Sequence, residues 1–171
     1  MALPGCSISV SVDGPQALVR LVGRAAAESA PAFERLIVRL KSEGVRCVVL
    51  DLSETLLMDS GFSGTLSRLV GAGGATFALY HAPQRILDGL DDHGVLDQVP
   101  LLKEEGAIPL GQGAVEVPLE PSSRSEILKC CLDAHRALMA LKPENVAKFE
   151  AVERFLSREA DKSASSETSS R

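Results

Sequence analysis

The run Cys47-Val48-Val49-Leu50-Asp51-Leu52 is almost unbroken apolar sequence. Such a run is typical of a central strand that is covered on both faces of its sheet. Apolar residues recur at helical spacing on either side of it, in 33–40 and in 62–69. A buried strand between two amphipathic helices predicts an α/β fold with helices packed on a sheet.

Four further segments, 8–12, 17–22, 75–80 and 99–102, are predicted as strands, which gives a mixed β-sheet of about five strands. Asp13-Gly14 predicts a hairpin between the first two. Helices are expected between Ser29, a candidate N-cap, and Gly44, from about 59 to 71, and over 83–94. Repeated Gly and Pro in 104–121, with a brief strand-like run at 115–119, indicate a linker or an edge extension.

Two more helices are predicted towards the C-terminus. Ser123 and Glu126 have the spacing of a capping box, and Pro143 suits the start of a second helix. Apolar stripes on both indicate a helical hairpin, which we expect to fold onto the sheet domain or onto a second copy of the chain. The predicted organisation is an α/β domain at 1–103, the linker or edge extension at 104–121, the hairpin at 122–160 and a disordered tail at 161–171.

Composition and charge exclude several function classes. The 171-residue chain carries 18 Lys and Arg against 23 Asp and Glu, a net charge of −5, which argues against a nucleic-acid partner. No apolar run of the ~20 residues that a membrane span requires is present, and the first residues lack the features of a signal peptide. We therefore expect a soluble cytoplasmic protein that does not bind a membrane.

Neither a metal site nor a cofactor is expected. The four cysteines form no Cys-x-x-Cys pair, and the three histidines lack ligand spacing. Gly61-Phe62-Ser63-Gly64-Thr65 lies where a hydrolase nucleophile elbow would lie, but the elbow needs glycine two residues after its serine, and Thr65 stands there. We predict no catalytic residues. A small enzyme or ligand binder with a cleft at Asp59 and Ser63 stays open as an alternative.

The segment Val48–Leu66, VVLDLSETLLMDSGFSGTL, resembles the signature of STAS domains, the fold of bacterial anti-sigma factor antagonists. That signature is an apolar strand ending in Asp-Leu-Ser, then Met-Asp-Ser and Ser/Thr-Gly-Leu-Gly at the start of a helix. Gly61 replaces the second hydroxyl residue, Phe62-Ser63 replaces the Gly-Leu pair, and Gly64 is kept. The resemblance covers roughly Ile8 to Leu102, and it is greatest to a subgroup with Phe at this position and C-terminal helical extensions.

The resemblance implies a regulatory protein-binding module without catalysis of its own. In the family, the serine after the aspartate accepts phosphate from a partner serine kinase, and this position is Ser60. The implied partner is an anti-sigma factor with serine kinase activity, with a homodimer as a further expectation. Unmodified protein would bind the anti-sigma factor and release a sigma factor, and phosphorylation would weaken the complex. The implied binding surface consists of neighbouring loops and the helix start, namely Asp59, Ser60, Gly61, Phe62, Ser63 and Gly64.

The residues themselves allow two interpretations of Ser60. A helix N-terminus presents unpaired N–H groups to a phosphate, whereas the Asp59 carboxylate would repel it, so phosphorylation would re-aim the loop. We expect the Ser60 hydroxyl to be exposed, because a kinase must reach it in line with the transferred phosphoryl group. Serine and aspartate also commonly cap helices. The alternative is therefore a non-signalling STAS module of a transport or sensory assembly, with Ser60 as a helix cap.

Overall fold

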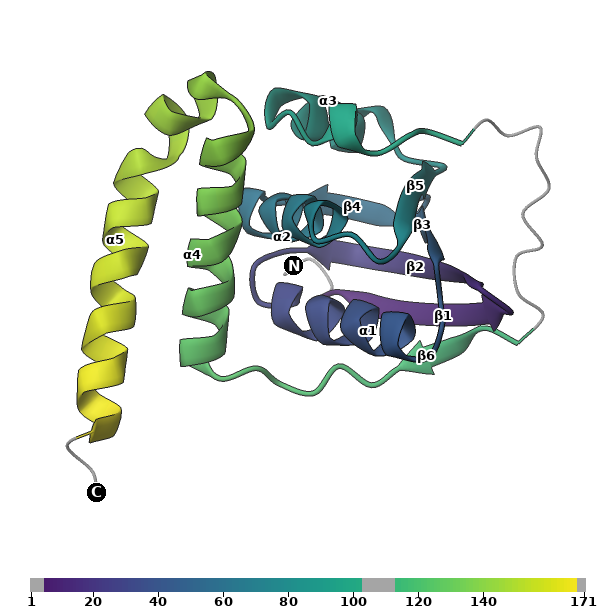
Figure 1. Ribbon diagram of the computed structural model, residues 1–171, viewed down its shortest axis with the longest axis horizontal. Coiled ribbons are helices and arrows are strands. Elements are labelled where there is room, and N and C mark those ends of the chain that lie inside the picture. Colours follow the sequence, from purple (N-terminus) through teal and green to yellow (C-terminus); the bar gives the residue numbers. More distant parts are fainter. Residues whose placement is uncertain (1–4, 103–112, 169–171) are drawn as a thin grey trace.

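The computed structural model describes residues 5–102 and 113–168 (Figure 1). The strands are β1 (Ser7–Asp13), β2 (Gln16–Ala25), β3 (Cys47–Asp51), β4 (Thr55–Met58), β5 (Thr76–Tyr80) and β6 (Val115–Val117). The helices are α1 (Ala30–Ser42), α2 (Ser60–Gly71), α3 (Gln84–Asp92), α4 (Arg124–Leu141) and α5 (Pro143–Thr168), with a short 3₁₀ turn, η1, at Leu96–Gln98.

The strands form a mixed sheet in the order β5-β3-β2-β1-β6, and β4 also pairs with β2. β1 and β2 are an antiparallel hairpin, whereas β2, β3 and β5 run parallel to one another. β6 adds to β1 as an antiparallel edge strand and includes the first three residues of the strand-like run at 115–119. The predicted α/β fold with a mixed sheet and a C-terminal helical hairpin is confirmed, with six strands in the described part of the chain instead of about five.

Two strand assignments need correction. The strand predicted at 99–102 is reduced to a single bridge between Leu79 and Leu101. Pro100 has no N–H to donate to a ladder, and η1 takes up the residues just before. The short connection after residue 54 contains β4, which continues the pairing with β2 beyond an irregularity at Gly23. Residues 104–112 of the expected linker lie outside the described part of the chain.

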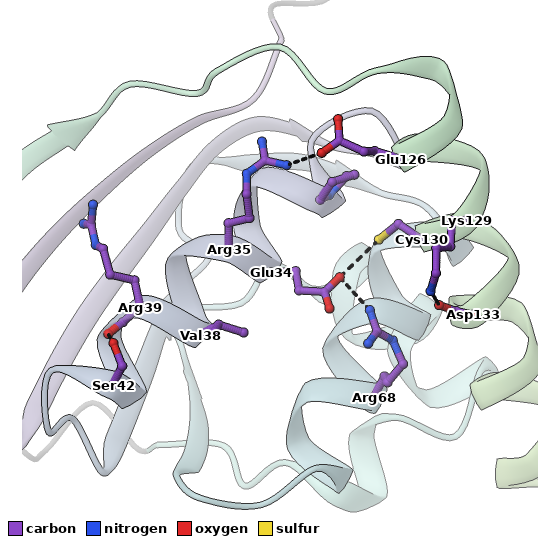
Figure 2. A pocket seen from close by; sticks show the side chains of 11 residues that line it. Glu34, Arg35, Val38, Arg39, Ser42, Arg68, Glu126, Lys129, Cys130 and Asp133 are labelled. Carbon is purple, nitrogen blue, oxygen red and sulfur yellow. Dashed lines mark hydrogen bonds and ion pairs between the residues drawn. The ribbon is translucent and has the colours of Figure 1, made fainter. Parts of the chain in front are cut away.

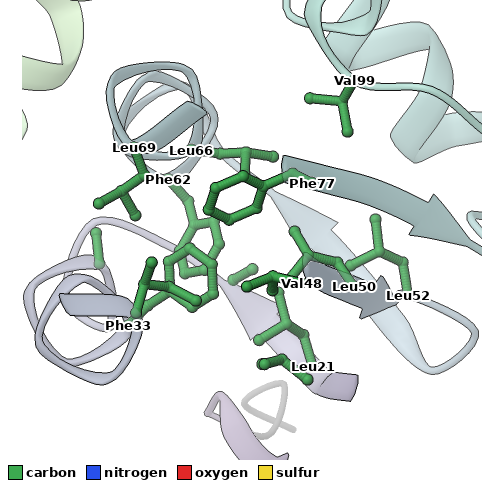
Figure 3. Close-up of a cluster of buried hydrophobic side chains, with 14 of the residues drawn as sticks. Leu21, Phe33, Val48, Leu50, Leu52, Phe62, Leu66, Leu69, Phe77 and Val99 are labelled. Carbon is green, nitrogen blue, oxygen red and sulfur yellow. The ribbon is translucent and has the colours of Figure 1, made fainter. Parts of the chain in front are cut away.

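The core lies between the sheet and helices α1 and α2 (Figure 3). The rings of Phe33 on α1 and Phe62 on α2 are fully buried, with their centroids 4.8 Å apart. They meet the apolar side chains of β3, among them Val48 and Leu50. Burying a phenylalanine contributes about 1.5–3 kcal/mol, so Phe62 holds the first turn of α2 firmly in place.

The helix ends agree only partly with their predicted caps. The capping box of α4 is confirmed, because Ser123 Oγ accepts from Glu126 N and Glu126 Oε2 accepts from Ser123 N, at 3.1 and 2.7 Å. Gly44 follows α1 with a φ of +98°, as predicted. Ser29 occupies the N-cap position of α1 but makes no side-chain cap hydrogen bond, because its hydroxyl donates to Ala26 O instead.

The tail predicted to be disordered at 161–171 is helical as far as Thr168, where α5 ends. The hydroxyls of Ser165 and Ser166 donate to the carbonyls of Asp161 and Lys162, so these short polar side chains bond to the helix itself. Residues 169–171 lie outside the described part of the chain.

The C-terminal hairpin folds onto the α/β domain of its own chain. Figure 1 shows α4 crossing the ends of α1 and α2, with α5 on the outer side of α4. The buried side of α4 includes Cys130, Ala134 and Leu138, whereas Cys131 is only half-buried. The hairpin therefore adds a layer over the start of α2.

Candidate functional site

Asp59 is the N-cap of α2. Its Oδ1 accepts a hydrogen bond from Phe62 N and its Oδ2 accepts one from Ala27 N, each at 2.9 Å. Each carboxylate oxygen therefore accepts a hydrogen bond from a backbone N–H, one at the start of α2 and one in the loop before α1. The interpretation of Ser60 as the helix cap is wrong, because Asp59 fills that role and Ser60 is the first residue of the helix.

Ser60 is bonded to the C-terminal hairpin. Its Oγ lies 3.0 Å from Nε2 of His135, a residue of α4 that is 3% exposed. Nδ1 of the same imidazole lies 2.7 Å from the carbonyl oxygen of Cys131. The expectation of a hydroxyl exposed at the mouth of a loop is wrong, because Ser60 is half-buried against α4.

The residues after Ser60 lie together as predicted, but they are buried. Phe62 is 0% and Ser63 1% exposed, and both neighbouring glycines are buried too. A Cβ added to Gly64 would overlap the carbonyl oxygen of Ala134 and lie 2.6 Å from its carbonyl carbon. Gly64 therefore permits the backbones of α2 and α4 to touch. α4 therefore covers the implied partner surface at Ser60 and Gly64, whereas Phe62 faces the core against Phe33.

The Asp-Leu-Ser end of β3 is structural. Asp51 is 1% exposed and accepts hydrogen bonds from Arg20 Nε and Ser53 N at 2.9 and 3.0 Å. Burial alone would raise the pKa of Asp51, but the Ser53 hydrogen bonds and the Arg20 guanidinium outweigh it and hold this pKa below its ordinary value. This carboxylate joins β2 to the turn after β3.

The surroundings of Ser60 are negatively charged. Burial first, and then the charges of Asp59, Cys130 and Glu28, raise the pKa of the Cys131 thiol to about 11. The negative charge of Asp59 and Glu28 therefore reaches Cys131 in the middle of α4, one helical turn from His135. An additional anion at Ser60 would meet this negative potential.

A groove of about 590 Å³ lies beside the site, between α1, α2 and α4 (Figure 2). Three ion pairs lie within its lining (Figure 2): Arg35–Glu126 at 3.4 Å, Arg68–Glu34 at 2.6 Å and Lys129–Asp133 at 2.7 Å. The remaining charge, Arg39, pairs with Glu43 outside the groove. Neither Asp59 nor Ser63 lines this groove. The cleft considered at those two residues is not open to a ligand, since Ser63 is buried.

Over residues 5–102 and 113–168, no group of three or more His, Cys, Asp and Glu side chains could hold a metal ion. No helix in these ranges is long and apolar enough to cross a membrane.

The α4 side of the site was missed by sequence reasoning. His135, Cys130 and Ala134 were separate features of the sequence, and His135 in particular lacked any ligand spacing. Two signals could have found the contact. Small or apolar residues recur every fourth position at Cys130, Ala134 and Leu138, and a glycine inside a helix, Gly64, indicates a close backbone approach.

No protein-family model matches the chain, and no curated protein sequence matches it. Among solved structures, the chain is similar to the anti-sigma factor antagonist SpoIIAA in its unphosphorylated form, with a TM-score of 0.49 and 16% identity over 57% of this chain and 90% of that one. A structure of the Bacillus cell fate determinant SpoIIAA in its phosphorylated form gives a TM-score of 0.47 and 17% identity, over 60% and 96%. The likeness concerns the fold, and we argue function from the residues of the site.

Proposed function

We propose that this protein is a regulatory protein-binding module resembling an anti-sigma factor antagonist, and that a partner serine kinase phosphorylates Ser60 in a partner-switching pathway. The observation that carries the proposal is the position of the Asp59-Ser60 pair. Asp59 caps a twelve-residue helix and Ser60 is its first residue, in the motif that resembles the STAS signature. The positive end of the helix dipole favours a phosphate on Ser60 Oγ.

In this proposal, unmodified protein binds the anti-sigma factor, and phosphorylation weakens the complex. A phosphoserine adds a charge of about −1.5 to −2 at neutral pH. Beside Asp59, this charge meets a like charge, and an interface that buries it unpaired loses several kcal/mol. The protein performs no chemistry itself, since the phosphoryl donor and the catalytic groups belong to the kinase.

The first test is whether the chain carries phosphate on Ser60 in its native cell. Trypsin releases this serine in the fragment Cys47–Arg68, and fragmentation of that peptide distinguishes Ser60 from Ser53, Ser63 and Ser67. We expect one phosphate, on Ser60, which Ser60→Ala abolishes. The exposed Ser53 provides the matched control, because Ser53→Ala should leave the phosphate in place.

The second test is partner binding by full-length variants. Ser60→Ala should still capture the kinase-like anti-sigma factor, whereas Ser60→Asp should release it faster, because charge buried at an interface acts mainly on dissociation. The proposal fails if Ser60 never carries phosphate and neither variant changes the partners captured.

A non-signalling role is the second candidate, favoured by the contact between Ser60 and His135. In a transport or sensory assembly, Ser60 would serve as an anchor for α4 and not as a cap, because Asp59 is the cap. Capture of a transporter or receptor subunit in place of a kinase, with unmodified Ser60, would support this function.

A further inference from the structure

α4 covers the phosphorylation site proposed above through three contacts with α2. The Ser60 hydroxyl meets His135, Thr65 Oγ1 lies 3.4 Å from Cys130 Sγ, and the backbone of Gly64 touches Ala134. The covered stretch is the one that a kinase must approach. Since phosphoryl transfer requires in-line access to Ser60 Oγ, the docked hairpin and a bound kinase compete for the same surface.

The hydrogen-bond partners of His135 determine whether the Ser60 hydroxyl donates or accepts. A carbonyl oxygen can only accept a hydrogen bond, so the Nδ1 that lies 2.7 Å from Cys131 O carries a proton. In the neutral imidazole, Nε2 is then the acceptor, and the Ser60 hydroxyl donates to it. This bond needs the hydroxyl proton, which a phosphate ester no longer has.

We propose, on the basis of the proposed phosphorylation of Ser60, that phosphorylation of this serine and docking of α4 on α2 are mutually exclusive, so that the α4–α5 hairpin is the moving part of the switch. Transfer of the γ-phosphoryl group of ATP forms the Oγ–P bond and breaks the bond from the γ-phosphorus to the bridging oxygen, which leaves with ADP. The hydroxyl proton passes to a base of the kinase. The docked hairpin is compatible with unmodified Ser60, and phosphoserine releases it.

Space and charge both favour release. Ser60 Oγ lies 3.0 Å from His135 Nε2, which leaves no room for a phosphoryl group between these two atoms, and one helical turn further on the backbones of α2 and α4 already touch at Gly64 and Ala134. Asp59 and Glu28 already place negative charge at Cys131. On α4, the ammonium group of Lys129 is paired with the Asp133 carboxylate on the exposed side of the helix. His135, if protonated, could instead hold the phosphate, and the two outcomes are distinguished by the exchange and alkylation experiments.

We expect α4 and α5 to leave α2 together, because contacts hold these two helices to each other. Over α2 the buried residues of α4 are Cys130, Ala134 and Leu138, of which only Leu138 is large. At the end of α3 the hairpin is also held by Phe149, whose ring lies 5.5 Å from that of His93, and by the 2.8 Å bond from Asn145 Nδ2 to His93 O, so release has to break these contacts too. Within the hairpin, by contrast, Arg136 pairs with Glu153 at 2.9 Å, and Phe149 lies edge-on to the His135 ring at 5.2 Å. The segment 118–123 between β6 and α4 contains neither helix nor strand, so rotation there moves the hairpin without breaking the sheet.

The test uses the full-length chain with phosphoserine incorporated genetically at position 60, so no kinase is needed. We expect hydrogen exchange of the α4 amides in 130–138 to become roughly tenfold faster or more, while the amides of β3 (47–51) stay protected. Phosphoserine at the exposed Ser53 is the matched control for added charge. Ser60→Ala, which removes the donor but adds no bulk, should leave the hairpin docked.

The rate at which iodoacetamide alkylates Cys131 gives a second readout. This rate should rise if the hairpin is released and fall if the hairpin stays docked. If phosphoserine releases α4, the thiol leaves its buried site and reacts several-fold faster. If the hairpin stays docked, the added negative charge raises the thiol pKa further and the reaction becomes slower. The tryptic fragment Cys130–Arg136 reports this residue, and fragmentation distinguishes it from Cys130.

Unchanged or stronger protection of α4, slower alkylation of Cys131, or loss of protection in β3 as well would each overturn this inference. None of these results bears on whether a kinase modifies Ser60 in the cell, since the phosphate is installed without one. Conversely, if Ser60 carries no phosphate in the cell, the proposed function fails, even if the genetically encoded phosphoserine releases the hairpin.

Discussion

The hydroxyl of Ser60, the first residue of α2, lies 3.0 Å from Nε2 of His135, which is 75 residues further along the chain. This contact joins the residue that resembles a phosphoacceptor to the helical extension that follows the α/β domain. Asp59, one residue earlier, is bonded only within the domain, to Ala27 N and Phe62 N. The two adjacent residues therefore have separate roles: Asp59 builds the helix start, and Ser60 connects it to α4.

Asp59→Ala should lower the free energy of unfolding by about 1–2 kcal/mol, because it removes the N-cap of α2 and leaves Ala27 N without its acceptor. Asp59→Asn retains an oxygen for one of these bonds and should cost less. Urea denaturation measures both. Glu54→Ala, at an exposed carboxylate in a 3.8 Å pair, is the control and should change stability by less than about 0.5 kcal/mol. Equal effects of the Asp59 and Glu54 variants would contradict the capping role.

Gly64→Ala and Gly89→Ala should have opposite effects on stability. Both glycines lie inside helices, where alanine is intrinsically better by up to about 1 kcal/mol. At Gly89 on α3 an added Cβ meets nothing within 4 Å, so the variant should be more stable. At Gly64 the Cβ overlaps the α4 backbone at Ala134, and overpacking of this kind costs about 1–3 kcal/mol. Equilibrium denaturation of the two variants measures both changes in stability. A stabilised Gly64→Ala variant would mean that α4 does not pack against Gly64 in solution.

The free energy of unfolding should fall as the pH drops below the ordinary histidine pKa of 6.5, in part because of His93. This residue follows α3, and its carbonyl accepts from Asn145 Nδ2 at 2.8 Å, at the turn between α4 and α5. Burial lowers the pKa of His93, although Asp92 opposes this effect, and Lys148, His135 and Lys142 lower the pKa further.

A depressed histidine pKa means that the folded chain binds fewer protons than the unfolded chain just below pH 6.5. Stability is therefore lost as the pH falls from 6.5 towards the folded-state pKa, with a slope of at most about 1.4 kcal/mol per pH unit for one proton. Urea denaturation between about pH 7.5 and 5 measures the slope. His93→Gln should flatten it, and an unchanged slope in that variant would assign the pH dependence to other groups.

Local patterns in the sequence determined most of the elements of this protein. The apolar run at Cys47–Leu52 specifies a buried strand whatever surrounds it, and Asp13-Gly14 specifies the turn of the first hairpin. The capping box at Ser123 likewise acts within four residues. Each of these features depends on neighbours in the chain, which is why periodicity and turn chemistry predicted them. β4 escaped prediction because its four residues pair with β2 only when the sheet already exists.

Only the tertiary structure decided what the Asp59–Gly64 segment does in the folded chain. Sequence placed these residues at a helix start, and it left open whether Ser60 was an exposed acceptor or a cap. The answer, a half-buried hydroxyl held by His135, depends on α4 docking across α2, a contact between segments about seventy residues apart. Long-range packing of this kind depends on shape, here on the missing side chain of Gly64 and the small one of Ala134, and a short sequence pattern does not encode which helix meets which.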